Sequence, residues 1–419
     1  MAGIPLNSGN KVYAVIRKAL LAWENPFVAA ALTAEICLIY VPTVIYPWLN
    51  SNFPYFNYLA DAFLHGQLHL RLIPPITQDL SLFQGSYYLY WGPLPAILAL
   101  PFVAIFGIQA SDILQSIAAG ALNVGLFALL LRVLAERGFV VLSPARRAAF
   151  VLFFAFGTAQ APIMLFGGVW DLSQLETMSM VLLAYLAAFA FRGPRAFWWT
   201  GCAVAGILLT RLGAAFAALF LAWYLLRTHW QLGLRQLARL CLLAMAPVLT
   251  VFFLLGVYNY LRFGSPLDNG VAYHVMHEKF IALASQYGIF NLHYVPTNLY
   301  LNYLYYPLAN FFSGRPSTVA LGGSLFLLSP LFLAAPFALW REPRRVDQWV
   351  LCGAFLLGNI PALIIMAPGS EQFGPRYLLD AAVPLLLLTA RGMKRWPAAL
   401  IAVLTGLSVL QYILGIFGF

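Results

Sequence analysis

The sequence is dominated by long apolar runs that are separated by short polar or basic segments. They lie near residues 27–48, 112–134, 148–168, 177–191, 197–210, 212–227, 240–257, 318–340, 348–366, 377–390 and 397–417. A helix needs about 20 apolar residues to cross a bilayer, and only helices and closed barrels satisfy their backbone hydrogen bonds in lipid. Because barrel strands are much shorter than these runs, the sequence predicts an all-α polytopic membrane protein with about eleven transmembrane helices.

The composition excludes the other broad classes of protein. Of the 419 residues, 62% are hydrophobic and only 9% are charged, whereas soluble domains carry about 25% charged residues. The four cysteines lie in apolar runs and have neither zinc-site nor disulfide-framework spacing. The net charge of +10 would suit nucleic acid, but the cations form short clusters between apolar runs, which is typical of cytoplasmic loops.

The distribution of lysine and arginine predicts the orientation. With the N-terminus in the cytoplasm, most of the 24 basic residues lie on the cytoplasmic side. Within the cytoplasmic segment 1–26, residues 11–24 form a basic amphipathic stretch that predicts a helix on the inner leaflet. We therefore expect a multi-pass protein of the bacterial inner membrane.

Two long stretches, 49–111 and 258–317, are predicted to lie outside the cell as loops with interfacial helices. Both are rich in aromatic residues, some of which an interfacial aromatic belt explains. Residues 92–107 are apolar but short and contain three prolines. If they crossed, the later cation clusters would face outward, so we interpret them as a re-entrant or interfacial element. Nothing resembles a separate soluble domain, and residues 1–419 form one membrane domain.

Carboxylates and arginines gather in the predicted outer segments. A short amphipathic helix, NYLADAFLHG, carries Asp61 and ends at Gly66, and a later polar turn carries Asp79. The other candidates are Asp171, Glu176, Arg211, Arg262 and Arg376. Each has a simpler explanation, such as solvation, snorkelling or anchoring of a helix end. Together they suit a lipid-linked phosphate held by arginines, beside a carboxylate that takes a proton from a hydroxyl group.

The sequence gives little support for a metal site or for the catalytic motifs of soluble enzymes. The sequence has no phosphate-binding glycine loop, no HExxH and no GxSxG. The pairs His65/His69 and His274/His277 have helical spacing, but no carboxylate set accompanies them as a metal site would require. We expect no metal to be needed, with a divalent ion as the less favoured alternative.

Four motifs resemble those of a known family. They are NYLADAFLHG followed by GSYYLYWGPLPAILALP, AGILLTRLGA, YNYLRFGSP, and FGPRYLLD. In this order, over residues 27–390, the chain resembles the GT-C superfamily of integral-membrane glycosyltransferases. That superfamily includes protein O-mannosyltransferases and the aminoarabinose transferase of lipid A.

The resemblance implies a seven-span core, a catalytic acid in the first outer loop, and a polyprenyl-phosphate sugar donor used on the outer face. Arg211 matches the basic residue that binds the donor phosphate in relatives, and Arg376 or Arg262 would assist it. Asp171 and Glu176 match a loop that often holds another acid, on the acceptor side. Many relatives carry the catalytic acid seven or eight residues before the position of Ala60, where this chain has Asn52-Phe53-Pro54. The base is therefore Asp61 or Asp79.

The sequence thus predicts transfer of a sugar from a polyprenyl-phosphate donor to a hydroxyl on a glycan, lipid or protein acceptor. A transporter or lipid flippase is an alternative, which would place ionisable residues along a path open to both faces. A non-catalytic partner in a cell-envelope complex is another.

Overall fold

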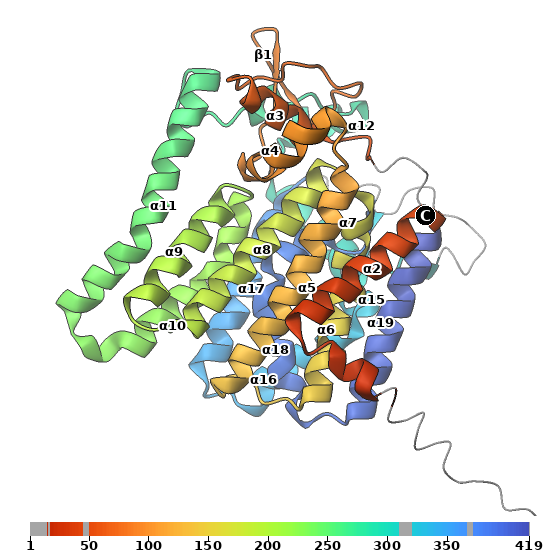
Figure 1. The fold of residues 1–419 in the computed structure, drawn as a ribbon, viewed down its shortest axis with the longest axis vertical. Helices are drawn as coiled ribbons and strands as arrows, with labels where there is room; N and C mark the ends of the chain where they lie inside the picture. The colour runs from red at the N-terminus through yellow and green to blue at the C-terminus, as the bar shows by residue number, and fades with distance from the viewer. Residues whose placement is uncertain (1–14, 16, 45–49, 310–320, 367–371, 419) are drawn as a thin grey trace, which may run out of the picture.

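The computed structural model describes residues 15, 17–44, 50–309, 321–366 and 372–418 as a helical bundle with a smaller layer at one end (Figure 1). Of the predicted cytoplasmic segment, residues 1–14 and 16 lie outside the described residues, and residues 17–22 are helical. The longer bundle helices are α2 (Pro26–Val44), α5 (Asp112–Glu136), α8 (Val169–Ala190), α9 (Pro194–Leu208), α11 (Leu234–Phe263), α17 (Val346–Ile364) and α19 (Ala398–Gly418).

The other bundle passages are broken or short. Helices α6 (Pro144–Phe156) and α7 (Gln160–Phe166) meet at a bend of 48°. Other passages combine a 3₁₀ turn with a short helix: η2 (Leu212–Ala218) with α10 (Leu219–His229) and η3 (Trp230–Leu232), and η8 (Arg376–Ala381) with α18 (Ala382–Gly392) and η9 (Met393–Arg395). A further passage consists of α15 (Leu325–Leu328), η7 (Pro330–Ala334) and α16 (Ala335–Arg341).

The protein is a multi-pass helical membrane protein, but fewer helices qualify as spans than the apolar runs predict. Among the described residues, 6 helices are long and apolar enough to cross a membrane: α5, α8, α11, α17, α19 and the passage from η2 through α10 to η3, taken as one helix. The number is 7 if the bent pair α6 and α7 is one span. The predicted number of about eleven exceeds this. Several runs are divided by turns, so their helices are too short to cross alone.

The layer at the upper end of Figure 1, which we call the α3 end, is formed by the two long loops. The first loop supplies α3 (Tyr55–Leu64), the hairpin β1 (Ser81–Phe83) and β2 (Ser86–Tyr88), α4 (Leu94–Phe106) and η1 (Gly107–Gln109). The second supplies η4 (Val271–Tyr273), α12 (Glu278–Tyr287), η5 (Leu292–Tyr294), α13 (Val295–Leu299) and the π-helical turn η6 (Tyr300–Leu304). Two short strands, β3 (Leu321–Gly322) and β4 (Gln372–Phe373), pair in parallel.

The first loop contains the two helices α3 and α4, and the sequence makes a prediction about each. Helix α3 ends at Leu64, and Gly66 follows with φ of 70°, so the predicted glycine-terminated helix is confirmed. The apolar stretch 92–107 forms α4, which lies beside α3 at this end rather than along the bundle (Figure 1). This arrangement agrees with an element that does not cross.

Helix α11 extends farther than its apolar run, which was predicted to end at 257. It continues to Phe263 and is capped by Gly264, whose φ of 77° is left-handed and whose N–H donates to the carbonyl of Tyr260 at 2.8 Å. The second loop therefore begins at Gly264 rather than at 258, and Arg262 belongs to the last turn of a helix.

At the opposite end of the bundle, arginine side chains connect the junctions between helices, and we call this end the cation-rich end. Arg146 donates to the carbonyl of Lys394 at 2.9 Å, Arg391 to that of Phe139 at 3.1 Å, and Arg341 to that of Gly392 at 3.0 Å. These bonds join the α5–α6, α16–α17 and α18–α19 junctions, which the sequence assigns to the cytoplasm.

Apolar packing fixes the α3 end on the bundle. The main core lies between α5, α6, α8 and α18, and a second cluster lies between α3, α4 and the start of α8. The carboxylate of Asp112 accepts bonds from the backbone N–H groups of Ser51 at 2.8 Å and Gly168 at 2.9 Å. The segment before α3 is thus tied to the starts of both α5 and α8.

Candidate functional site

Arg211 lies at the break between α9 and η2, in the motif AGILLTRLGA. The Thr210 hydroxyl donates to the carbonyl of Ile207 at 2.9 Å, and Arg211 is extended (φ −143°), which ends the helix. Its Nε donates to the Oδ2 atom of Asp380 at 3.0 Å, with side chains that are 17% and 10% exposed. A guanidinium has five N–H donors, so this bond orients Arg211 without using its other donors.

A second buried ion pair, between Arg376 and Asp171, lies near the pair of Arg211 and Asp380. Nη1 of Arg376, at the start of η8, is 2.7 Å from Oδ1 of Asp171 in the first turn of α8. Burial by itself lowers the pKa of Arg376, but the charge of Asp171 and the hydrogen bond outweigh burial, and the pKa is raised overall. Arg376 therefore stays charged although it is buried.

Tyr377 brings the two pairs together. Its ring centroid is 5.6 Å from Cζ of Arg211 and 5.4 Å from Cζ of Arg376, within cation–π distance of both. Asp171 also lies within electrostatic reach of Arg211. Two arginines predicted from separate motifs thus surround one aromatic ring.

The polar turn of the first loop approaches the same place. Asp79 has φ of 65°, and its Oδ1 is 2.6 Å from Nε2 of His274 in the second loop. Tyr90 contacts the His274 ring edge-on, with centroids 5.2 Å apart, and stacks on Trp91 at 4.0 Å. Burial raises the pKa of Tyr90 well above its ordinary value, the charge of Asp79 raises it further, and Arg211 opposes this. Tyr90 therefore stays protonated between Asp79 and the arginines.

A close backbone contact holds this part of the loop against the Arg211 turn. The N–H of Leu94 donates to the carbonyl of Leu209 at 3.0 Å. A Cβ atom on Gly92 would lie 2.1 Å from that same carbonyl oxygen. Only glycine fits there, and this explains a glycine in the motif GSYYLYWGPLP.

Asp61 has a different environment. Its two carboxylate oxygens accept a bidentate pair of bonds from Arg71, at 2.9 and 3.0 Å, and Nδ1 of His65 lies 3.6 Å from Oδ1. Within the described residues, Asp61 forms ion pairs with Arg71 and His65 and none with Arg211 or Arg376. The sequence could not separate the two acids, because Arg71 follows Asp61 by ten residues with no regular spacing.

Arg262 is not part of the group formed by Arg211, Arg376, Tyr377, Asp171 and Asp380, which we call the Tyr377 cluster. Its Nη1 donates to the carbonyl of Leu89 at 2.8 Å, its Nη2 donates to the side chain of Asn259 at 2.8 Å, and its Cζ lies 3.8 Å from the ring centroid of Tyr258. It therefore anchors the chain directly before Tyr90.

Glu176 is buried in α8, and its Oε2 has no hydrogen-bond partner among the described atoms. It forms no ion pair with either arginine within the described residues. The residues that sequence reasoning did not select are Tyr90, His274, Tyr377 and Asp380. The motifs GSYYLYWGPLP and FGPRYLLD contain three of them, which was the available signal.

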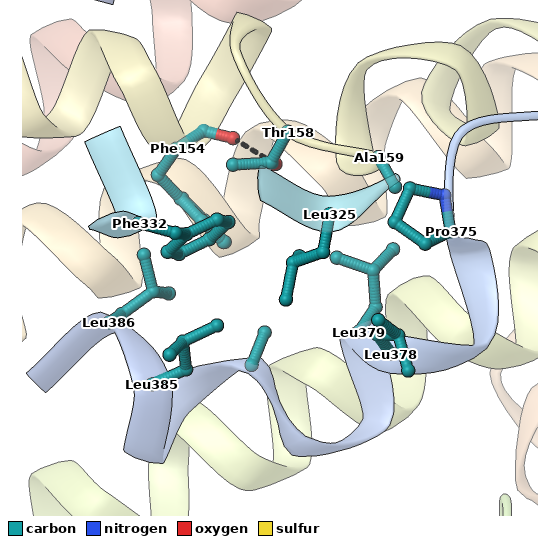
Figure 2. Close-up of a pocket in the computed structure, with 11 residues that line it drawn as sticks. Phe154, Thr158, Ala159, Leu325, Phe332, Pro375, Leu378, Leu379, Leu385 and Leu386 are labelled. Carbon is teal, nitrogen blue, oxygen red and sulfur yellow. Dashed lines mark hydrogen bonds between the residues drawn. The ribbon is translucent and has the colours of Figure 1, made fainter. Parts of the chain in front are cut away.

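An apolar cavity lies next to the cluster, bordered by Pro375, the neighbour of Arg376. Figure 2 shows side chains such as Phe154, Leu325 and Leu385 around it, with the Thr158 hydroxyl bonded to the carbonyl of Phe154. Its volume of about 10 Å³ admits about one water molecule. It is too small for a lipid tail.

No protein-family model and no curated protein matches the sequence, but solved structures do. The Archaeoglobus fulgidus oligosaccharyltransferase, tethered with an acceptor peptide containing the NVT sequon, aligns over 96% of this chain and 54% of its own, at 14% identity and a TM-score of 0.52. That enzyme in complex with Zn and sulfate aligns over 92% and 53%, at 15% identity and 0.50. The chain shares the fold of that oligosaccharyltransferase. It spans about half the length of the oligosaccharyltransferase.

ArnT from Cupriavidus metallidurans, bound to undecaprenyl phosphate, also matches, over 93% of this chain and 76% of its own, at 12% identity and a TM-score of 0.49. The oligosaccharyltransferase match confirms the fold expected from the motifs. At these identities the likeness concerns the fold.

Among the described residues, no group of three His, Cys, Asp or Glu side chains is arranged so that it could hold a metal ion. Asp79 and His274 form only a pair, and Asp171 and Asp380 are engaged by arginines.

Proposed function

We propose that this protein transfers a sugar from a polyprenyl-phosphate-linked donor to an acceptor hydroxyl on the extracytoplasmic face of the membrane. The observation that carries the proposal is the pair Arg211 and Arg376 around Tyr377, with Asp79 bonded to His274, whose ring contacts Tyr90. Buried arginines suit a phosphate diester at the lipid boundary, and a nearby carboxylate suits a base.

Arg211 and Arg376 would hold the donor phosphate. Each binds a carboxylate with one nitrogen, Nε of Arg211 and Nη1 of Arg376. The other N–H groups of Arg211, and those that the hydrogen bond of Arg376 to Tyr377 leaves available, would bind phosphate oxygens. Charge-assisted bonds of this kind are about twice as strong as neutral ones. Asp380 and Asp171 are thus positioning residues for the arginines.

Asp79 would act as the base, in preference to Asp61. Its bond to His274 uses Oδ1, so Oδ2 can take the proton of the acceptor hydroxyl. The acceptor oxygen then bonds to the anomeric carbon, the bond from that carbon to the phosphate oxygen breaks, and polyprenyl phosphate leaves with its charge stabilised by the arginines. The bidentate bond to Arg71 leaves Asp61 less suited to this role. Glu176 has no contact that would assign it a step.

The orientation follows from the charges at the two ends. Cation-rich junctions favour the cytoplasm, which assigns the α3 end and the Tyr377 cluster to the extracytoplasmic side of a bacterial plasma membrane. The passages built from short or bent helices would also cross the membrane, packed against the long helices, which would give about eleven crossings.

The first test identifies lipid that copurifies with the protein by mass spectrometry. We expect a polyprenyl phosphate or its glycosylated form on the wild type, much less on Arg211→Gln, and a normal amount on the control Arg71→Gln. The absence of any polyprenyl phosphate from the wild type, or equal loss in both variants, would contradict the proposal.

The second test measures turnover of that glycosylated lipid by Asp79→Asn and by the matched control Asp61→Asn. A general base contributes about 10²–10⁴ in rate, so the first variant should lose that factor while the folded control retains turnover. The opposite result would assign the base to Asp61. Lipid movement between leaflets without glycosyl transfer would favour the transporter alternative, and donor binding with neither activity would favour a non-catalytic partner.

A further inference from the structure

A polar cavity lies at the cation-rich end, at the other end of the bundle from the Tyr377 cluster. Its volume is about 60 Å³, enough for a group of a few heavy atoms and several times the minimum for one water. Three junctions line it: the α5–α6 junction with Phe139, the end of α16 with Arg341, and the end of α18 with Arg391.

The lining carries an excess of positive charge. Its cations are Arg341, Arg345, Arg391, Lys394 and Arg395, and its one acid is Glu342. Asp347 is the other acid nearby. Arg345 lies 3.0 Å from Asp347 and 3.4 Å from Glu342, and Arg391 lies 2.6 Å from Asp347.

The other three cations of the lining are not neutralised. No carboxylate of the described chain lies within 4.0 Å of Arg341, Lys394 or Arg395, whereas Glu342 pairs with Arg345, and Asp347 pairs with both Arg345 and Arg391. The cavity therefore combines two neutralised cations with three that lack a counter-charge.

Arg391 is the buried element of this site. Its side chain is 6% exposed, its Cζ lies 3.7 Å from the ring centroid of Phe139, and its Nε donates to the carbonyl of Phe139. These contacts fix the guanidinium plane at the cavity wall. Arg391 therefore places a fixed positive charge beside the exposed cations of the cavity.

We propose that this cavity binds a phosphate group, and that the group is the headgroup of an anionic phospholipid. The cavity lies between helix ends at the level where Trp340 and Trp349 are exposed, and tryptophan favours the headgroup region. Basic pockets between helices at the cytoplasmic surface suit anionic headgroups. This site does not depend on the sugar-transfer proposal, because it shares no residue with it.

The test compares two double variants that remove equal charge. Lys394→Gln/Arg395→Gln removes exposed side chains of the cavity and leaves the bond from Arg146 to the Lys394 carbonyl intact. The control Arg235→Gln/Arg239→Gln removes two exposed cations of α11 that are not part of the cavity. Phosphatidylglycerol and phosphatidylcholine are titrated into the detergent-solubilised full chain, and bound lipid is counted by native mass spectrometry.

We expect the wild type to bind one phosphatidylglycerol in preference to phosphatidylcholine. Each surface cation contributes about fivefold in affinity, so the cavity variant should bind about 30-fold more weakly and the control as the wild type does. Displacement of the lipid by inorganic phosphate would support a phosphate site that also takes soluble anions, and resistance to it would support a lipid headgroup alone. Equal weakening in both variants, or no preference over phosphatidylcholine, would overturn the proposal.

Discussion

The ion pair between Arg211 and Asp380 allows the stability of the fold to be separated from donor binding. The two side chains are 17% and 10% exposed, and their atoms Nε and Oδ2 are 3.0 Å apart. Removing one partner of a buried pair costs about 3–5 kcal/mol, because the other charge is left uncompensated, whereas removing both is often nearly neutral. We therefore expect Arg211→Leu and Asp380→Leu each to destabilise the protein by about 3 kcal/mol, and the double variant by much less.

Donor binding should follow a different pattern across the same variants. If Arg211 binds the phosphate with its remaining N–H groups, the double variant recovers stability but not affinity. Losing one charge-assisted bond of about 1.5–3 kcal/mol weakens binding about 10- to 150-fold.

The assay is thermal unfolding of the detergent-solubilised variants, followed by titration with undecaprenyl phosphate. Arg211→Lys is the matched variant, since it keeps the charge but loses the planar fork, and it should bind with intermediate affinity. Wild-type affinity in the double variant would refute a phosphate role for Arg211. Single variants as stable as the wild type would refute the account of the pair.

Three further changes test how the cluster is positioned. Gly92→Val should abolish transfer, because its Cβ meets the Leu209 carbonyl at 2.1 Å, while the control Gly353→Ala, with no atom within 4 Å of its Cβ, keeps full activity; equal activity of the two would contradict the contact. Arg262→Gln should lower kcat more than donor affinity, since Arg262 holds the Leu89 carbonyl; lost donor binding alone would instead indicate a phosphate ligand. Tyr90→Phe should leave the rate–pH profile below pH 10 unchanged, because the pKa of Tyr90 is raised and its hydroxyl keeps its proton there; a shifted alkaline limb measured in stopped assays would disprove this.

Local chemistry made part of this structure predictable. Apolar runs located the bundle helices, because burial in lipid requires helical backbone over such lengths. Gly66 located the end of α3, and the change from apolar helix to the polar Thr210 and Arg211 located the break after α9. The positions of these helices and of their ends depend only on residues that are close together in the sequence.

The site itself depends on contacts between distant residues. Arg211 and Asp380 are 169 positions apart, and His274 and Asp79 are 195 apart. Aspartate adopts a positive φ more often than most residues do, but the residue type alone does not predict that Asp79 does so or that it meets His274. Sequence reasoning could select the arginines and acids by type, but not assign which acid binds which arginine.

The length of α11 determines how far the first loop lies from the hydrocarbon core of the membrane. Its 30 residues make a rod of about 45 Å, roughly 15 Å longer than the hydrocarbon core is thick. If its first turn lies near one surface of the membrane, the helix projects beyond the opposite surface. Arg262 in its last turn donates a hydrogen bond to the carbonyl of Leu89, the residue before Tyr90. In the proposed reaction, the first loop would therefore lie above the acyl chains, where an acceptor from the aqueous phase reaches the headgroup of a donor whose polyprenyl tail stays in the bilayer.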